Sequence, residues 1–287
     1  MALIENIVIV GPTASGKTDL AIEIAERHNA EIICADSRTI YKEMNIGTAK
    51  PTQLQQNMVK HHCINLVSPN ELFTVADFVK AARAAEHSIL NKNKRIVTVG
   101  GSGLFVDAYV YEYSFTAPNR DVREQYSDET IESLHKIILQ KGLQLPTNNK
   151  NKRHLLHVLE REGQPAPTRK PLPSSTLYVG ISPPKLLLHK RIQQRAQQML
   201  KSGVLREVAD LYHRYGDQPA FHGGAYGVLR QYINSSKNDS TLAEALVRSD
   251  ISLAKRQLTW FRRNSDIVWF NDTQSAYAWL DSNSRVH

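Results

Sequence analysis

Short apolar runs and longer amphipathic stretches alternate along this chain. The apolar runs cover residues 6–10, 31–35, 95–99, 177–181 and 267–270. Each run is brief and shows little alternation, which is typical of strands buried on both faces of a parallel sheet. Between them the periodicity predicts helices over residues 19–27, 75–90, 185–200 and 241–262. Strands alternating with helices predict an α/β fold, a parallel sheet flanked by helices.

A glycine-containing segment follows the first predicted strand. Residues 11–18 read Gly-Pro-Thr-Ala-Ser-Gly-Lys-Thr, which matches the phosphate-loop pattern G-x-x-x-x-G-K-[ST]. Such a loop directs backbone N–H groups at phosphate oxygens, and the next helix adds the positive end of its dipole. The motif predicts a P-loop NTPase-like core that binds a polyphosphate or diphosphate. The expected phosphate ligands are Gly11, Thr13, Ala14, Ser15, Gly16, Lys17 and Thr18, with the Thr18 hydroxyl also on Mg²⁺.

Two more motifs end predicted strands, and the carboxyl ends of parallel strands are where such sheets bind ligands. Asp36 ends the second strand and can act as a general base, bind Mg²⁺ through water, or merely cap a helix. The glycine-rich turn 100–103 brings the Ser102 hydroxyl to the same rim. Arg195 shares a helical stripe with Arg191, so it either closes on phosphates or is solvated.

Composition changes between the third and fourth long strands. From residue 136 to 170 there are eight Lys and Arg residues against two acidic ones. We expect residues 114–174 to form a small inserted helical subdomain with a basic face, within a core made of 1–113 and 175–287. The net charge of +8 suits a nucleic-acid partner or simply a basic protein.

Cysteine usage and hydropathy restrict the protein class. Cys34 and Cys63 form neither a disulfide framework nor a metal-ligand cluster, and we expect both to be buried. No basic leader precedes the first strand, and no apolar run approaches the roughly 18 residues of a membrane span. We expect a cytoplasmic monomer without membrane contact.

Seven segments, spread over nearly the whole chain, match one enzyme family in that family's own order. They are the phosphate loop 11–18, Asp36-Ser37-x-x-x-Tyr41, the run from Met44 to Pro51, His61-His62, Val75 to Phe78, Val99 to Leu104, and Arg256-Gln257-x-Thr259-Trp260. On these segments the chain resembles the tRNA dimethylallyltransferases, also called tRNA isopentenyltransferases.

The resemblance implies a reaction. A dimethylallyl group would move from its diphosphate to N6 of adenosine 37, beside the anticodon of tRNA. The phosphate loop would hold the donor's diphosphate with Lys17, Arg195 and Mg²⁺ on Thr18. Asp36 would accept a hydrogen bond or proton from the N6 amine, and Ser102 stands where the family usually has Thr, near the reacting centre.

The resemblance also implies the tRNA contacts. The inserted subdomain would clasp the anticodon stem-loop. The residues expected to touch tRNA are Asp36, Ser37, Arg38, Thr39, Ser102, Arg123, Arg153, His154, His157 and Gln257. The chain departs from the family at Asn65, usually acidic, and at His157 and His222, both usually Arg. Donor chemistry is therefore retained, while RNA docking is altered.

The residues also leave other functions open. A P-loop kinase of a small metabolite would explain the phosphate loop and Asp36 but not the basic insertion. A prenyltransferase acting on a free adenine nucleotide would not need that insertion. A non-catalytic RNA-binding module would keep the loop only as a relic.

Overall fold

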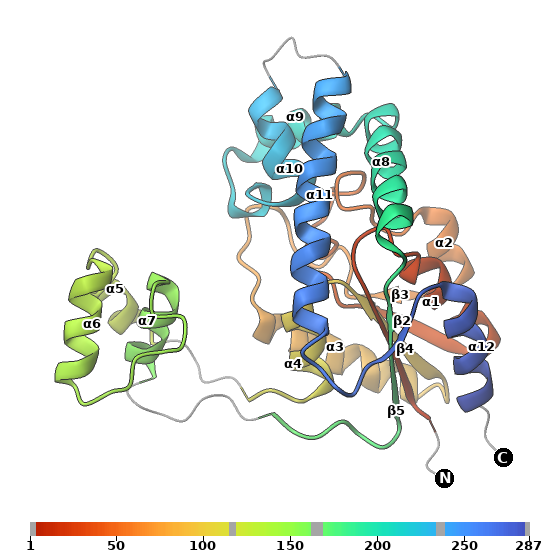
Figure 1. The fold of residues 1–287 in the computed structure, drawn as a ribbon, viewed down its shortest axis with the longest axis horizontal. Coiled ribbons are helices and arrows are strands. Elements are labelled where there is room, and N and C mark those ends of the chain that lie inside the picture. The colour runs from red at the N-terminus through yellow and green to blue at the C-terminus, as the bar shows by residue number, and fades with distance from the viewer. Residues whose placement is uncertain (1–3, 115–118, 162–168, 234–238, 285–287) are drawn as a thin grey trace. The chain divides into compact units, whose positions relative to one another are not determined.

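A computed structural model describes residues 4–114, 119–161, 169–233 and 239–284. Its centre is a sheet of six strands, all parallel, in the order β3-β2-β4-β1-β5-β6 (Figure 1). The strands are β1 (Asn6–Val10), β2 (Ala30–Cys34), β3 (His61–His62), β4 (Arg95–Gly100), β5 (Thr176–Ile181) and β6 (Val268–Phe270). The predicted α/β class is confirmed.

The prediction of five strands was incomplete, because it missed β3. This edge strand has two half-buried histidines and pairs only with β2. A strand this short has no hydrophobic period to detect. The central strands, in contrast, are almost fully buried and apolar, with Ile7, Val8 and Ile9 wholly inaccessible to solvent. Cys34 and Cys63 are also buried, as expected.

Helices cover both faces of the sheet. The helices α1 (Lys17–Arg27) and α12 (Thr273–Asn283) pack on one face, where Leu20 and Leu280 join the main hydrophobic core. The other face is covered by α3 (Val75–Leu90) and α4 (Gly103–Val110), which meet through the stacked rings of Phe78 and Phe105. A capping box between Thr74 and Asp77 starts α3.

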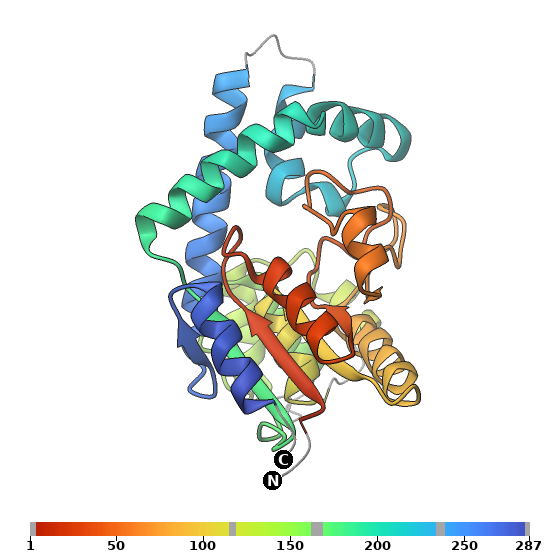
Figure 2. The same cartoon turned by 90° about the vertical axis from the view of Figure 1, so that its right-hand side faces the viewer.

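A group of helices stands beyond the carboxyl ends of the strands (Figures 1 and 2). It contains α8 (Lys185–Lys201), α9 (Val204–Tyr215), α10 (Gly224–Leu229) and α11 (Asp239–Phe261), with the short α2 (Gln53–Met58) beside them. The 310 turns η1 (Pro219–Phe221) and η2 (Arg230–Tyr232) join them. This arrangement places long helices over the rim where the sequence motifs end.

Residues Glu112–Pro171 form a separate compact unit, and the rest of the chain forms the other. The smaller unit holds α5 (Arg120–Gln125), α6 (Ile131–Gln140) and α7 (Lys152–Glu160). It has its own hydrophobic core, made by Leu134, Ile138, Leu155, Leu156 and Leu159. The expected insertion, 114–174, covers nearly the same residues.

Among the described residues, no helix is both long and apolar enough to cross a lipid bilayer. The cytoplasmic location and the monomeric state expected from the sequence stay predictions.

Glu31, near the start of β2, is a buried acid with three basic neighbours. His62 Nε2 lies 2.7 Å from its carboxylate, Lys94 Nζ lies 3.1 Å away, and Lys92 Nζ lies 3.2 Å away. Burial alone would raise the pKa of Glu31, but hydrogen bonds from His62, Lys94 and Lys92 outweigh it and lower the pKa to about 2. Since its ordinary value is 4.5, Glu31 stabilises the fold above pH 4.5 and loses that contribution as the pH falls toward 2.

We predict that Glu31→Gln lowers the free energy of unfolding at pH 7 by about 2 kcal/mol. The difference from the wild type should shrink as the pH falls from 4.5 toward 2, because the carboxylate is protonated there. Urea denaturation at several pH values measures this. Glu23→Gln, at an exposed position of α1, is the control and should show neither effect. A difference that is constant with pH would contradict the assigned ion pairs.

Candidate active site

The phosphate loop leads from β1 into α1 by a backbone path that needs glycine at two positions. Gly11 has φ 155°, and a Cβ there would lie 2.5 Å from the carbonyl oxygen of Ile181 on β5. Gly16 has φ 92°, a left-handed conformation that L side chains rarely adopt, and it precedes the first turn of α1. The motif therefore has the backbone shape that directs the N-terminus of α1 at a ligand.

Lys17 lies at the start of α1, beside the loop. Its Nζ donates to the carbonyl oxygen of Pro12 at 3.1 Å. Burial lowers the pKa of Lys17 to about 8, Asp36 and Asp250 act in the opposite direction, and Arg195 adds to the lowering. Lys17 is thus a desolvated cation that an anionic ligand would stabilise.

Two arginines of α8 reach across to the loop. Arg195 Nη1 donates to Thr13 Oγ1 at 2.7 Å, and Arg191 Nη1 donates to the Ser15 carbonyl oxygen at 3.1 Å. They point the same way because they are four residues apart on a helix. Arg195 thus lies at the phosphate loop, and its role in closing on phosphates stays a prediction.

Asp36 follows β2, in a turn that is joined to the glycine-rich turn after β4. The backbone N–H of Arg38 donates to Asp36 Oδ1 at 2.8 Å, and that of Ser37 donates to Ser102 Oγ at 2.9 Å. The Oγ atoms of Ser37 and Ser102 lie 3.1 Å apart. Since the next helix begins only at Gln53, Asp36 caps no helix, and the capping alternative is wrong.

The residues after Asp36 also make hydrogen bonds within the chain. Arg38 Nη1 donates to the carbonyl oxygen of Ala220 in η1 at 2.9 Å, so its guanidinium links the β2 turn to the helices above. Thr39 Oγ1 makes a long hydrogen bond, 3.4 Å, to the Asp36 carbonyl oxygen, and Thr39 is buried.

Gln257, on α11, joins the phosphate loop to the glycine-rich turn. Its Oε1 accepts the Thr13 N–H at 2.8 Å, and its Nε2 donates to the Gly101 carbonyl oxygen at 3.0 Å. The sequence-based expectation is a tRNA contact, whereas in the structure both ends of this amide hold backbone groups of the site. One turn further along, Trp260 Nε1 donates to Asp107 Oδ2 of α4 at 2.7 Å.

Asp250 is a functional candidate that the motifs did not indicate. It lies on the same stripe of α11, seven residues before Gln257, and is only 8% exposed. Its Oδ2 is 3.6 Å from Arg195 Nε. Burial raises the pKa of Asp250, and the nearby Arg195 and Lys17 partly offset this. Only the approach of α11 to the phosphate loop brings these charges together.

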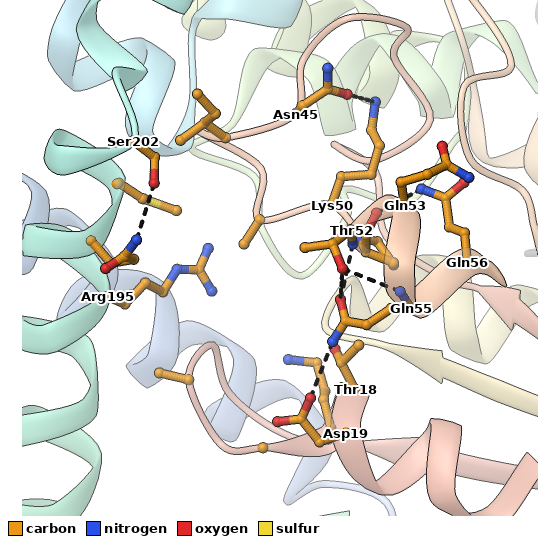
Figure 3. Close-up of a pocket in the computed structure, with 18 of the residues that line it drawn as sticks. Thr18, Asp19, Asn45, Lys50, Thr52, Gln53, Gln55, Gln56, Arg195 and Ser202 are labelled. Carbon is orange, nitrogen blue, oxygen red and sulfur yellow. Dashed lines mark hydrogen bonds between the residues drawn. The ribbon is translucent and has the colours of Figure 1, made fainter. Parts of the chain in front are cut away.

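Two cavities adjoin at the phosphate loop. The smaller has a volume of about 120 Å³, and its lining includes Lys17, Asp36 and Asp250. The larger, about 1010 Å³, lies between the loop, α8 and residues 42–56. Figure 3 shows Thr18 at its floor, Arg195 and Ser202 on one wall, and Lys50 to Gln56 on the other. Lys17, Thr18, Ala49, Pro51 and Arg195 line both cavities.

Glu207, on α9, holds the wall formed by residues 45–47. Its carboxylate accepts backbone N–H groups of Asn45, Ile46 and Gly47 at 2.9–3.0 Å, and the Tyr226 hydroxyl also donates to it. Sequence reasoning missed this contact, because about 160 residues separate the partners.

Lys50 is buried on the same wall, with an ammonium surrounded by neutral oxygens. Its Nζ donates to the Tyr41 carbonyl oxygen at 2.7 Å, to Asn45 Oδ1 at 3.0 Å and to Asn65 Oδ1 at 2.6 Å. Burial lowers the pKa of Lys50 to about 8, although Glu207 and Glu43 act to raise it. Asn65, the position expected from the resemblance to be acidic, thus offers Lys50 a neutral oxygen.

The four residues of the smaller unit that are expected to contact RNA form two pairs. Arg153 and His154 are exposed on the first turn of α7. Arg123 Nε and His157 Nδ1 lie 2.6 and 2.8 Å from the carboxylate of Glu160, which is buried. Glu160 thus holds Arg123 and His157 together, an arrangement that the sequence motifs did not indicate.

His222, the third departure, is exposed and pairs with Asp217 at 2.9 Å. Arg230 binds the same carboxylate, so this carboxylate has two cationic or potentially cationic partners.

A sequence model of the IPP transferase family matches residues 39–264, and one of isopentenyl transferases matches residues 4–73. The chain belongs to the IPP transferase family. The resemblance inferred from the motifs is confirmed.

Individual members of this family are similar over nearly the full chain. A tRNA dimethylallyltransferase of Oceanobacillus iheyensis is 34% identical over 92% of this chain and 90% of its own length. The enzyme of the same name from Bacillus subtilis is 33% identical over 93% of this chain and 90% of its own length.

Solved structures of tRNA isopentenylpyrophosphate transferases are similar to this chain as well. A full-length tRNA isopentenylpyrophosphate transferase from Bacillus halodurans gives a TM-score of 0.73 at 26% identity, covering 98% of this chain and 97% of that one. A tRNA delta(2)-isopentenylpyrophosphate transferase from Staphylococcus epidermidis gives 0.71 at 28% identity, covering 97% of each. The P-loop NTPase-like fold expected from the phosphate loop is thereby confirmed.

We predict that Asn65→Asp raises the pKa of Lys50 and stabilises the fold by about 1 kcal/mol at pH 7, because the buried ammonium gains a charged acceptor. Below pH 8 Lys50 is protonated in both folded and unfolded wild-type chains. The gain should therefore be complete there, and it should fade as the pH rises from about 8 to the new, higher folded-state pKa.

Chemical denaturation at pH 7 and pH 10 measures both effects. Asn70→Asp, in an exposed loop, makes the same change in net charge and should leave stability nearly unchanged. If the Asn65→Asp protein is no more stable than this control, a charged acceptor at residue 65 does not stabilise the Lys50 ammonium, and the prediction is wrong.

Proposed function

We propose that this enzyme transfers a dimethylallyl group from dimethylallyl diphosphate to N6 of adenosine 37, next to the anticodon of tRNA. Its family membership makes it a prenyl transferase that acts on tRNA. The observation that carries the finer proposal is the pair of cavities that adjoin at the phosphate loop, since a transfer reaction needs two substrates to meet at one point.

The donor's diphosphate fits the phosphate loop. Backbone N–H groups from Gly11 to Thr18, the Lys17 ammonium and the Arg195 guanidinium would bind its oxygens. When the bond from C1 of the dimethylallyl group to the diphosphate oxygen breaks, the electron pair stays on that oxygen. Fixed cations at this place stabilise the developing charge without reorganisation.

The acceptor side fits the smaller cavity. The adenine must leave its stack for N6 to reach the donor carbon. N6 forms the new bond to C1 and loses one proton, for which Asp36, lining this cavity, is the candidate base. Ser102 holds the turn that follows Asp36, through its hydrogen bond with Ser37.

Magnesium suits the donor site. The Thr18 hydroxyl lines both cavities and is a hard oxygen ligand of the kind Mg²⁺ prefers. Among the described residues no cluster of three or more His, Cys, Asp or Glu residues could hold a metal ion, so its other ligands would be diphosphate oxygens and water. When bound, Mg²⁺ would neutralise charge on the leaving diphosphate.

The smaller unit would bind the anticodon stem-loop. Arg153 and His154 are exposed at the start of α7, and Glu160 fixes Arg123 and His157. Such groups bind RNA through phosphates.

A transfer assay tests the proposal as a whole. Radiolabelled dimethylallyl diphosphate, Mg²⁺ and an anticodon stem-loop with adenosines at 36 to 38 should give labelled RNA, and replacing adenosine 37 by guanosine should abolish the label. Label on AMP but not on RNA would favour the free-nucleotide enzyme. No transfer to either acceptor would contradict the proposal.

We predict that Asp36→Ala lowers kcat by about 10²–10⁴, the usual effect of removing a general base, with little change in the KM for the donor. Asp36→Asn is the matched variant, because its amide oxygen can still accept the Arg38 N–H. Single-turnover transfer should be slow in both variants. A near-normal rate for Asp36→Asn would mean that Asp36 only shapes the turn.

We predict that changing Lys152 and Arg153 together to Ala raises the KM for tRNA and reduces the slope of log affinity against log salt by up to about two, because each lost phosphate contact removes roughly 0.7–0.9. A control pair, Lys60 and Lys80, is exposed on the larger unit and removes the same charge. An unchanged salt slope would exclude these two residues of the smaller unit from phosphate contacts with tRNA.

A further inference from the structure

A carboxylate lies beside the cations that we assign to the donor's diphosphate. Asp250 lines the smaller cavity together with Lys17, Thr18 and Arg195. It is nearly buried, so solvent screens its charge weakly. A negative charge close to a bound polyanion weakens its binding. The carboxylate can do so directly, or by occupying a cation that the anion needs.

The cation that Asp250 faces is Arg195, and their contact is loose. Arg195 Nη1 is fixed by its 2.7 Å hydrogen bond to Thr13 Oγ1. Its Nε lies 3.6 Å from Asp250 Oδ2, beyond hydrogen-bond distance, and finds no hydrogen-bond partner within the described residues. The pair is therefore held by charge alone, and a better acceptor can replace Asp250.

Opposite charges lie close together around the site. Lys17 and Arg195 contribute two positive charges, and Asp36 and Asp250 contribute two negative ones. Arg191 at the loop and Arg38 in the lining of the smaller cavity add further positive charge. A bound diphosphate needs both cations, so it must compete with Asp250 for Arg195. Two unit charges a few ångströms apart in such surroundings interact strongly enough to change affinity severalfold.

We propose that Asp250 limits how tightly the site retains diphosphate, by competing with it for Arg195, and so favours release of inorganic pyrophosphate after transfer. This inference rests on the proposed assignment of the phosphate loop to the donor's diphosphate. Asp250 touches no reacting atom in this scheme, and it acts through Arg195.

Calorimetric titration with inorganic pyrophosphate and Mg²⁺ at pH 7, below the pKa of about 8 of Lys17, tests the proposal. Asp250→Asn should lower the Kd for pyrophosphate by at least about threefold, with a parallel fall in its inhibition constant against the donor. Glu244→Gln is the matched control, since it removes the same charge from an exposed position of the same helix, and its Kd should equal that of the wild type. Thermal melting checks the fold, and Asp250→Ala serves if the Asn variant is unstable.

The same titrations in an Arg195→Ala background test the competition. Without Arg195, adding the Asp250→Asn substitution should change the Kd for pyrophosphate little, so that the ratio of the two Kd values falls toward one. An equal ratio in both backgrounds would mean that Asp250 repels pyrophosphate directly, and would overturn the competition with Arg195.

The outcomes separate the two proposals. A wild-type protein that binds no pyrophosphate would contradict the donor site itself. A wild-type protein that binds pyrophosphate, with an Asp250→Asn variant that binds it equally or more weakly, would overturn only the role of Asp250.

Discussion

The side-chain amide of Gln257 is the contact on which the geometry of the site depends. Parallel strands bring the phosphate loop and the glycine-rich turn to one rim, but register alone does not set the distance between two loops. Gln257 accepts a hydrogen bond from Thr13 and donates one to Gly101, so a single rigid group sets that spacing. Partly buried hydrogen bonds of this kind cost stability when they are left unmade. The stripe of α11 that carries Gln257 also presents Asp250 and Trp260, so the orientation of one helix positions all three.

Carboxylates beside the cations distinguish this site from a simple anion-binding loop. Burial makes the Lys17 ammonium less favourable, and Asp36 and Asp250 compensate for that burial. The same carboxylates oppose an incoming diphosphate. Affinity therefore depends on the difference between two strong effects, and a change of one carboxylate can alter donor binding and product release.

Long-range contacts support the walls of the cavities. Glu207 binds three successive backbone N–H groups of residues 45–47, and Lys50 binds oxygens on the same wall. In the smaller unit, the Glu160 carboxylate similarly contacts both Arg123 and His157 and holds them together. In each case a buried or partly buried charge organises residues that local sequence leaves undefined.

Patterns of local sequence were sufficient for the α/β class, the longer strands, the helices α1, α3, α8 and α11, the phosphate loop and the family. Each depends on neighbouring residues: a buried strand is a short apolar run, and Gly11, Gly16 and Lys17 act within one turn. They were insufficient for β3, which is too short to show a period, and for the partners of Gln257, Asp250 and Glu207. These side chains act on groups far away in the sequence, and only the packing of α9 and α11 over the sheet decides which groups they reach.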